Sequence, residues 1–150
     1  MTKVGNNFEK TKKAWIDYLE ALPWTFFITG TTRYELTLKS NRRLQERFFE
    51  ALCLRNSKMF WVSEPFDLKE GYHSHSLFYI PDNIEPFNPE SEFLFREIVN
   101  TWQWATGNKD LTKENWSRIR IQKYDPKRGA GGYCGKYLFK TDADYDLLYR

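Results

Sequence analysis

A hairpin in the middle of the chain constrains the fold more than any other sequence feature. Residues 58–66 (KMFWVSEPF) and 72–80 (YHSHSLFYI) are strand-like runs rich in aromatic and other apolar residues, and the short polar stretch DLKEG joins them. Strands that follow one another across so short a connection pair antiparallel. The pattern therefore predicts an antiparallel sheet in which these two runs are neighbours.

Further helices and strands are predicted on both sides of this hairpin from the spacing of apolar residues. They are helices over 8–22, 39–54, 90–105 and 133–140, with residues 129–132 leading into the last, and strands over 24–32 and 116–124. Strands mixed with long helical connections are typical of an α+β fold, in which helices cover the faces of one mostly antiparallel sheet. No linker or repeat interrupts the 150 residues, so we expect residues 1–150 to form a single domain.

Composition excludes several classes of protein. Hydrophobic residues make up 41% of the chain and charged residues 29%, which fits neither a disordered nor a fibrous protein. No apolar run approaches the ~20 residues that span a bilayer, and the N-terminal segment lacks the apolar stretch of a secretory signal. Cys53 and Cys134 have no metal-type spacing. We expect reduced thiols in a cytoplasmic protein that does not bind membranes.

Aromatic and basic residues indicate a polyanionic partner. Aromatic residues make up 18% of the chain, and such side chains stack on unpaired nucleic-acid bases as well as filling cores. Residues 109–140 contain nine Lys and Arg residues against three Asp and Glu residues. This basic segment either binds phosphates or simply faces solvent. The candidate DNA-binding residues are Arg118, Arg120, Lys123, Lys127, Arg128 and Lys140.

The two histidines of the chain, His73 and His75, lie two positions apart in a predicted strand. Side chains at i and i+2 project from the same face of a strand, so the imidazoles lie side by side. Glu64 joins them if the numbers of paired hairpin residues sum to 137, which puts Glu64 directly across from His73. This set suits Mg²⁺ or Mn²⁺ used on phosphates, and would also take Zn²⁺. On its own, Glu64 is typical of an ordinary charged residue at a strand edge.

The segment GAGGYCGKYLFK, residues 129–140, is a second cluster of candidate residues. On a helical wheel, Tyr133, Tyr137, Lys136 and Lys140 share one face. We expect the helix to pack on its small and apolar side and to present the phenols and ammonium groups together. The glycines of this segment would let an anion approach free backbone N–H groups. The alternative is that both tyrosines are core aromatics.

These motifs resemble those of HUH endonucleases, and specifically of rolling-circle replication initiators (Rep proteins). The family's His-hydrophobe-His motif is matched by HSH at 73–75, and its upstream acidic ligand is similar to Glu64. Its Tyr-x-x-Lys-Tyr motif is matched by YCGKY at 133–137, and its aromatic-rich strand motif is similar to FFITGTT at 26–32. The motifs occur in the family order. Ser74 departs from the family, which usually has an apolar residue there.

The resemblance implies a fold and an activity. The implied fold is a central, mostly antiparallel five-stranded sheet flanked by helices, the HUH nuclease fold. The implied activity is site-specific nicking and joining of single-stranded or hairpin origin DNA, which initiates rolling-circle replication of a plasmid or virus. His73, His75 and Glu64 would hold Mg²⁺ or Mn²⁺, which polarises the scissile phosphate. A helicase and a polymerase of the host or replicon are the implied further partners.

The resemblance also assigns roles to the residues of the predicted last helix. Tyr133 would attack the phosphate, giving a 5′-phosphotyrosine and a free 3′-OH. It lies in the first turn, where the helix dipole is strongest, so its position also favours it as the nucleophile. Lys136 would steer the phosphate or stabilise the developing charge. Tyr137 would be either a second nucleophile or an aromatic that positions the DNA.

Three other functions are compatible with the same motifs. An HUH-type tyrosine transposase has similar chemistry, but normally lacks the Lys-Tyr ending of the tyrosine motif. A conjugative relaxase usually has a third histidine, which this chain lacks. A non-catalytic module that binds single-stranded nucleic acid around a structural metal would use the same basic and aromatic residues. A covalent protein–DNA adduct would distinguish the enzymes from the binding module.

Overall fold

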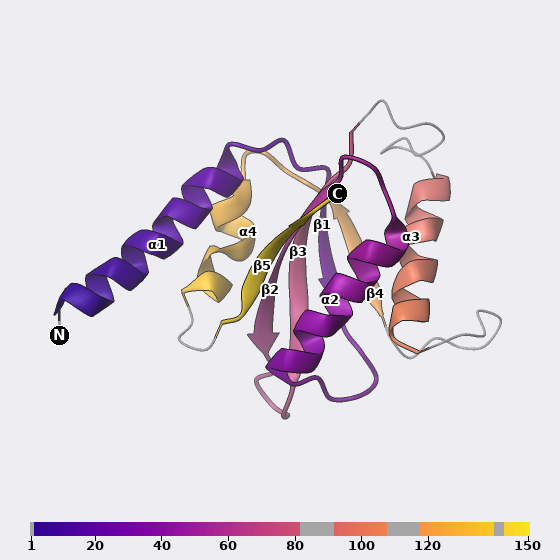
Figure 1. The fold of residues 1–150 in the computed structure, drawn as a ribbon, viewed down its shortest axis with the longest axis horizontal. Helices are drawn as coiled ribbons and strands as arrows, with labels where there is room; N and C mark the ends of the chain where they lie inside the picture. The colour runs from indigo at the N-terminus through magenta and orange to yellow at the C-terminus, as the bar shows by residue number, and fades with distance from the viewer. Residues whose placement is uncertain (1, 82–91, 108–117, 140–142) are drawn as a thin grey trace.

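A computed structural model describes residues 2–81, 92–107, 118–139 and 143–150, which form an α+β fold around a five-stranded antiparallel sheet (Figure 1). The strand order is β4-β1-β3-β2-β5, and every pair of neighbours is antiparallel. The helices are α1 (Thr2–Glu20), α2 (Leu38–Leu52), α3 (Glu92–Ala105) and α4 (Gly129–Leu138). The strands are β1 (Phe26–Gly30), β2 (Lys58–Pro65), β3 (Tyr72–Tyr79), β4 (Ile119–Lys123) and β5 (Tyr145–Tyr149).

The expected helices and strands are all present, but α1 begins six residues earlier than expected and α4 four residues earlier, so the expectation that Tyr133 lies in the first turn of its helix was wrong. The hairpin pairs in the predicted register, with Glu64 across from His73 and Pro65 across from Tyr72. The fifth strand, β5, was not predicted from the sequence. Of the described helices, none combines the length and the apolar character that a bilayer span requires.

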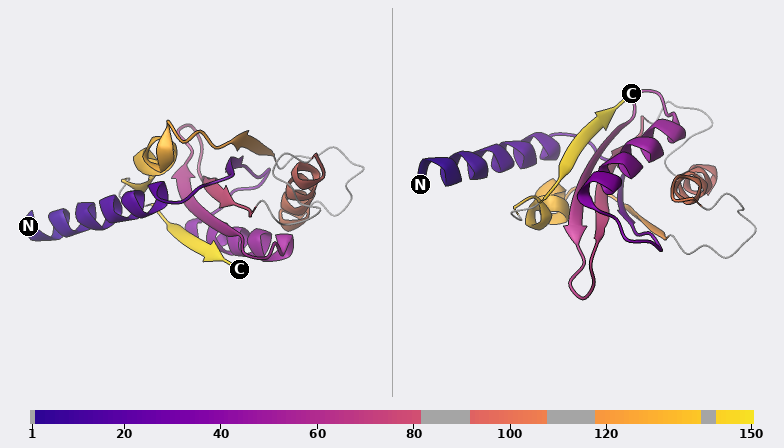
Figure 2. Two further views of the ribbon diagram at one scale, coloured as in Figure 1. Left: turned by 90° about the horizontal axis from the view of Figure 1, so that it is seen from above. Right: turned by 60° about the horizontal axis from the view of Figure 1, so that its bottom comes forward.

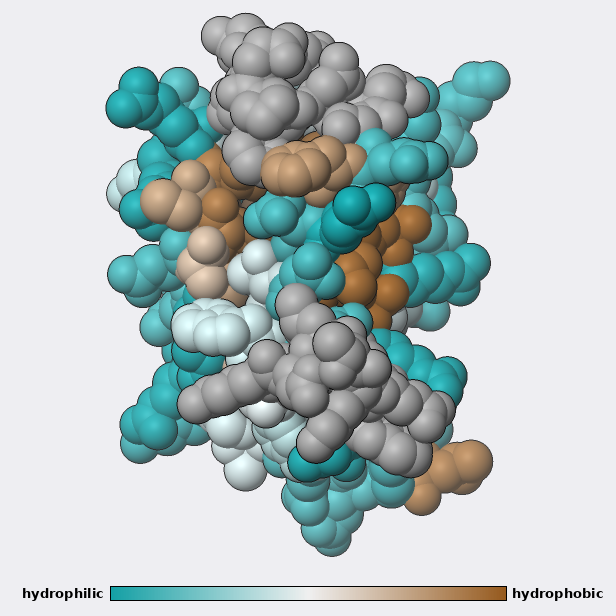
Figure 3. Space-filling model, turned by 90° about the vertical axis from the view of Figure 1, so that its right-hand side faces the viewer, coloured by the Kyte–Doolittle hydropathy of each residue, from teal (hydrophilic) through white to brown (hydrophobic). Residues whose placement is uncertain are grey.

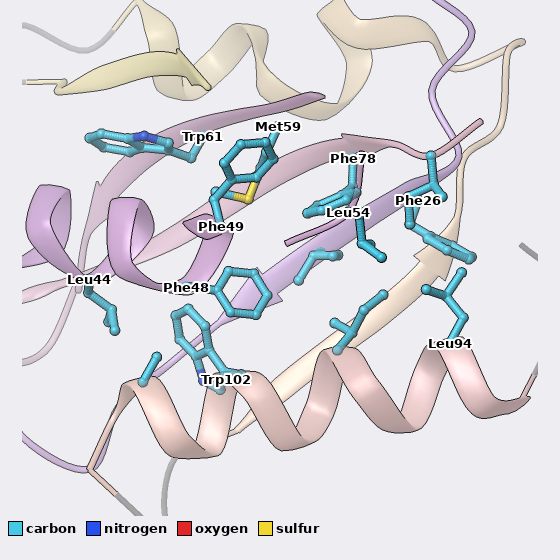
Figure 4. Packing of buried hydrophobic residues seen from close by; sticks show 14 of the residues in the cluster. Phe26, Leu44, Phe48, Phe49, Leu54, Met59, Trp61, Phe78, Leu94 and Trp102 are labelled. Atoms are coloured by element: carbon cyan, nitrogen blue, oxygen red, sulfur yellow. The ribbon is translucent and has the colours of Figure 1, made fainter. Parts of the chain in front are cut away.

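Helices α2 and α3 cover one face of the sheet. Phe48 of α2 meets Trp102 of α3 edge to face, with ring centroids 5.2 Å apart. Both rings belong to one buried cluster with strand residues such as Met59 and Phe78, which are completely buried (Figure 4). Side chains from five elements meet in this cluster, so burial of apolar surface fixes the helices on the sheet.

Helices α1 and α4 pack on the opposite face, so the sheet lies between two helical layers (Figure 2). Leu19 of α1, Cys134 of α4 and Leu77 of β3 are all completely buried in the core on this side. α1 extends past the sheet, and its N-terminal end lies away from the other elements (Figures 1 and 2). The C-terminal part of α1 is therefore the part that supports α4.

A set of ionic contacts ties β5 to α2. The Arg42 guanidinium lies 2.7 Å from an Asp144 oxygen and 3.0 Å from an Asp146 oxygen, and it stacks over the Trp61 ring at 5.1 Å. These contacts raise the pKa of Arg42, chiefly through the hydrogen bond with Asp144. β5 is thus held both by its pairing with β2 and by the ionic contacts with Arg42 of α2.

The side of the molecule that carries α3 is mostly hydrophilic. Apolar side chains appear there as separate patches among polar ones (Figure 3). Phe93 and Trp104 of α3 are about half exposed. Scattered exposed apolar residues of this kind are ordinary on protein surfaces.

Candidate metal centre and adjoining tyrosine

Glu64, His73 and His75 form a cluster at the turn end of the β2–β3 hairpin. The strand register puts their side chains on one face of the sheet, the face that α4 covers. His73 Nε2 lies 3.0 Å from Glu64 Oε1, and His75 Nε2 lies 3.6 Å from Glu64 Oε2. One ligand atom from each residue falls within 4.8 Å of the other two. The predicted grouping of these three residues is confirmed.

The donor atoms of this cluster suit a divalent metal ion. Two imidazoles and a carboxylate can bind Mg²⁺, Mn²⁺ or Zn²⁺, and three protein ligands leave positions open for water and a substrate oxygen. The side chains of His73, His75 and Glu64 are 13%, 8% and 18% exposed, so the cluster is shielded but still reachable from solvent. Among the described residues, no other group of three or more His, Cys, Asp or Glu side chains has this spacing.

Three neighbouring side chains hold the His75 ring. Tyr137 of α4 stacks on it, with ring centroids 4.1 Å apart and planes within 5° of each other. Phe27 of β1 lies parallel to it at 5.7 Å. Thr29, which pairs with His75 across the β1–β3 ladder, places its Oγ1 3.2 Å from Nδ1. Nδ1 is therefore engaged by Thr29, while Nε2 faces Glu64.

The hairpin turn stands beside the His73 ring. Phe66 packs against this ring with centroids 4.6 Å apart, and Lys69 Nζ lies 4.3 Å from the centre of the Phe66 ring. Leu68, in the turn, is 99% exposed. The edge of the cluster thus carries one ammonium group and one fully exposed apolar side chain.

Lys136 and Tyr137 join α4 to the cluster. Lys136 Nζ lies 4.7 Å from the centre of the Tyr137 ring. A hydrogen bond with the Tyr137 side chain raises the pKa of Lys136, and the charge of Glu64 adds to this effect. Lys136 therefore keeps its ammonium charge at neutral pH, beside the phenol and near the carboxylate. This end of α4 combines a phenol, a cation and a metal-ligand set.

Tyr133 lies in a different environment from Tyr137. Its phenol oxygen accepts a hydrogen bond from the backbone N–H of Asp125, at 3.1 Å. Its ring packs against Phe27 at 4.5 Å, and the Arg128 guanidinium covers it at 4.3 Å. The side chain is only 5% exposed. Tyr137 is also buried, at 8% exposed, so the interpretation as core aromatics describes the packing of both rings.

The expected orientation of α4 was wrong. Both tyrosines are buried and face the sheet. Of the residues expected to be presented together and described by the structure, Lys136 alone is exposed. The physical reason is that α4 packs against the sheet and against α1 beside it, so its aromatic side and its small-residue side are both buried. Cys134 is completely buried in this layer, and burial raises the pKa of its thiol to about 12. That thiol stays protonated and is no nucleophile.

The glycines at the start of α4 make room for helix α1. They do not form an open anion-binding site. The backbone N–H of Gly131 donates to Glu20 Oε1 at 3.2 Å. A Cβ at Gly131 would lie 2.9 Å from the same oxygen, so a larger residue would displace the Glu20 carboxylate from this N–H. A carboxylate at a helix N-terminus is favourable because it satisfies an unpaired N–H and complements the dipole. The expectation that the Gly131 N–H is free for a phosphate was therefore wrong.

Two of the predicted DNA-binding residues lie on the face of the sheet that carries the histidines. Arg120 of β4 pairs with Thr29 of β1, so its side chain shares the face of His75. Arg118 pairs with Thr31 just before β4 and projects from the same face. Both arginines are exposed at the edge strand of the sheet. Lys123 pairs with Phe26 and lies on the opposite face.

The remaining predicted contacts lie before and after α4. Lys127 and Arg128 are exposed in the segment before α4, and Arg128 is engaged with the Tyr133 ring and with the Gly132 carbonyl. Lys140 lies outside the described residues.

Sequence reasoning missed the residues that support the histidines, namely Phe27, Thr29 and Phe66. Phe27 and Thr29 belong to the motif FFITGTT, and their spacing of two puts both on one face of β1. Their contact with His75 depends on β1 pairing with β3, a long-range feature that no local pattern carries. Phe66 lies two residues after Glu64, a spacing that could have indicated its place beside the cluster.

The chain matches no protein-family model, no curated protein and no solved structure at the significance that such a match requires.

Proposed function

We propose that the chain is a metal-dependent endonuclease of the HUH type that nicks and rejoins single-stranded DNA through a phosphotyrosine, as a rolling-circle replication initiator does. The observation that carries the proposal is the stacking of Tyr137 on His75 at 4.1 Å, with the Lys136 ammonium 4.7 Å from the centre of the same Tyr137 ring. A nucleophile, a cation and three metal ligands thus meet on one side of the sheet. The proposed fold is the HUH nuclease fold, which the five-stranded antiparallel sheet flanked by helices supports.

Tyr137 is the proposed nucleophile, in place of Tyr133. The Tyr133 oxygen accepts a hydrogen bond from the Asp125 N–H, and the Arg128 guanidinium covers its ring. Tyr137 is in direct contact with a metal-ligand residue. This assignment departs from the family motif, in which the first tyrosine attacks, and it rests on the surroundings of the two phenols.

The proposed reaction exchanges one phosphodiester bond for another. The phenol oxygen of Tyr137 attacks the scissile phosphorus, and the bond to the 3′ oxygen breaks. The phenol proton is released to solvent and the leaving oxygen takes one up, so the products are a 5′-phosphotyrosine and a 3′-OH. A bound Mg²⁺ or Mn²⁺ supplies charge stabilisation at the phosphate. The Lys136 ammonium stabilises the negative charge on the attacking oxygen.

The DNA strand is proposed to lie across β1 and β4, beside the helix α4. Arg118 and Arg120 lie on this face, and both are exposed. We expect Arg120→Gln to weaken binding of single-stranded DNA about equally across sequences and to reduce the slope of log K against log salt by about 0.7. Lys123→Gln is the matched control, because it removes one charge from the other face of the same strand. An equal effect of both variants on the salt slope, measured by fluorescence anisotropy, would contradict this path.

The proposed function is tested by trapping the covalent intermediate. The protein is incubated with 5′- or 3′-labelled single-stranded oligonucleotides of varied sequence and Mn²⁺, and then denatured. We expect a protein–DNA band that survives boiling in detergent, retains label only from the 3′ side of the nick, and is absent when EDTA replaces Mn²⁺. DNA binding with no adduct under any metal would instead favour the non-catalytic binding module. Cleavage that proceeds fully in EDTA would exclude the metal assignment.

A further inference from the structure

The structure places the hydroxyl of Thr29 against Nδ1 of the His75 ring. Its Oγ1 lies 3.2 Å from His75 Nδ1, and the two residues are direct partners in the β1–β3 ladder. The stacked rings of Phe27 and Tyr137 set the plane of the His75 ring. The contact with Thr29 therefore distinguishes Nδ1 from Nε2, which faces Glu64.

The position of the Thr29 hydroxyl is itself well fixed. Thr is β-branched, so few rotamers are open to it in a strand. The next residue, Gly30, lies so close to Trp102 that a Cβ there would come within 2.6 Å of the indole. Trp102 also donates a hydrogen bond from Nε1 to the Thr31 carbonyl at 3.3 Å. Helix α3 thus holds the end of β1 from the opposite face of the sheet.

We propose that Thr29 is a positioning residue for the metal centre. Its hydroxyl accepts the Nδ1 proton of His75, which leaves the Nε2 lone pair directed toward Glu64, where a metal ion would sit. A ligand histidine whose other nitrogen is hydrogen-bonded has its tautomer and ring orientation fixed, and loss of such a partner typically weakens metal binding about 10- to 100-fold. The proposal rests on the metal site of the proposed function and adds to it a residue that does not touch the metal.

Two variants at position 29 separate the hydroxyl from the shape of the side chain. Thr29→Val keeps the β-branched shape, favours the strand and removes only the hydrogen-bonding group. Thr29→Ser keeps the hydroxyl and loses a methyl group. Thermal unfolding of both variants in EDTA checks that the fold is intact.

The readout is the affinity of the metal-free protein for Mn²⁺, measured by calorimetry or by the loss of the free-ion EPR signal. We expect Thr29→Val to bind Mn²⁺ about 10-fold more weakly than the wild type, and Thr29→Ser to bind close to the wild-type affinity. Adduct formation should distinguish Thr29→Val from Thr29→Ser in the same way. The Mn²⁺ concentration that gives half the maximal rate should rise about 10-fold for Thr29→Val, with a rate near wild type at saturating Mn²⁺.

Failure of this inference can be distinguished from failure of the proposed function. A wild-type protein that binds Mn²⁺ and forms the adduct, together with a Thr29→Val variant of equal Mn²⁺ affinity, would overturn the role of Thr29 alone. Equal weakening of Mn²⁺ binding by Thr29→Val and Thr29→Ser would also overturn it, because the shape of the side chain and not its hydroxyl would then determine the affinity. A wild-type protein that binds no Mn²⁺ would overturn both the metal site and the role of Thr29.

Discussion

Tyr137→Phe is expected to abolish the covalent protein–DNA adduct, whereas Tyr133→Phe is expected to retain it. The first change removes the oxygen that lies with Lys136 beside the metal-ligand cluster, and leaves the ring free to stack on His75. Without the attacking atom the reaction has no covalent route, so adduct formation should fall by roughly 10³-fold or more. Denaturing gels with labelled DNA and Mn²⁺ measure the effect, and peptide mapping identifies the modified residue.

Tyr133→Phe is the matched control, since it makes the same chemical change one helical turn away. The Tyr133 oxygen accepts a hydrogen bond from the Asp125 N–H, so its loss should lower the free energy of unfolding by about 1 kcal/mol while the adduct still forms. Mn²⁺ affinity should be unchanged in both variants. DNA attached to Tyr133, or an adduct that survives Tyr137→Phe, would return the assignment to the first tyrosine.

The sequence favoured Tyr133 as the nucleophile, but it could not show which of the two phenols meets the histidines. Residues four positions apart differ by about 40° around a helix, so Tyr133 and Tyr137 share a face on any helical wheel. Which phenol reaches the histidines depends on where α4 crosses the sheet. The close approach of α1 determines that crossing, through Glu20 at Gly131 and through Ile16, which would lie 3.5 Å from a Cβ at Gly135. These are contacts between segments more than 100 residues apart.

The metal-ligand cluster, by contrast, could be predicted from local sequence. The turn of the hairpin sets the register of its two strands, and strand periodicity then determines which side chains share a face. Glu64, His73 and His75 all belong to this hairpin, so no distant contact was needed to group them.

The strand β5 shows the opposite case. Its five residues, YDLLY, carry a weak pattern, and an isolated segment of this length has little preference for a strand. It pairs with β2, and Arg42 of α2 anchors Asp144 and Asp146 from about 100 residues away. Strand pairing and ionic contacts of this range depend on the complete fold. The order of the sheet could not be predicted for the same reason.

The second large effect is expected from Glu64→Gln, which should remove metal binding and with it the adduct. The amide has nearly the shape of the carboxylate but no charge, so the two imidazoles remain as the only strong donors of the cluster. Loss of a residue that merely touches a ligand costs about 10- to 100-fold in metal affinity, so loss of the charged ligand itself should cost at least about 100-fold. We expect EDTA to have the same effect on the wild type.

Metal-dependent stabilisation provides a measurement of this effect that does not involve catalysis. A ligand that binds only the folded protein stabilises it by about 2.7 kcal/mol at 100 times its Kd, so Mn²⁺ should raise the unfolding temperature of the wild type. Glu64→Gln should lose this rise, whereas Glu70→Gln, which removes an exposed charge from the turn of the same hairpin, should keep it. A Glu64→Gln variant that Mn²⁺ still stabilises to the wild-type extent would show that the ion binds elsewhere. In that case Glu64 would be an ordinary partner of His73, and the metal role of the cluster would be lost.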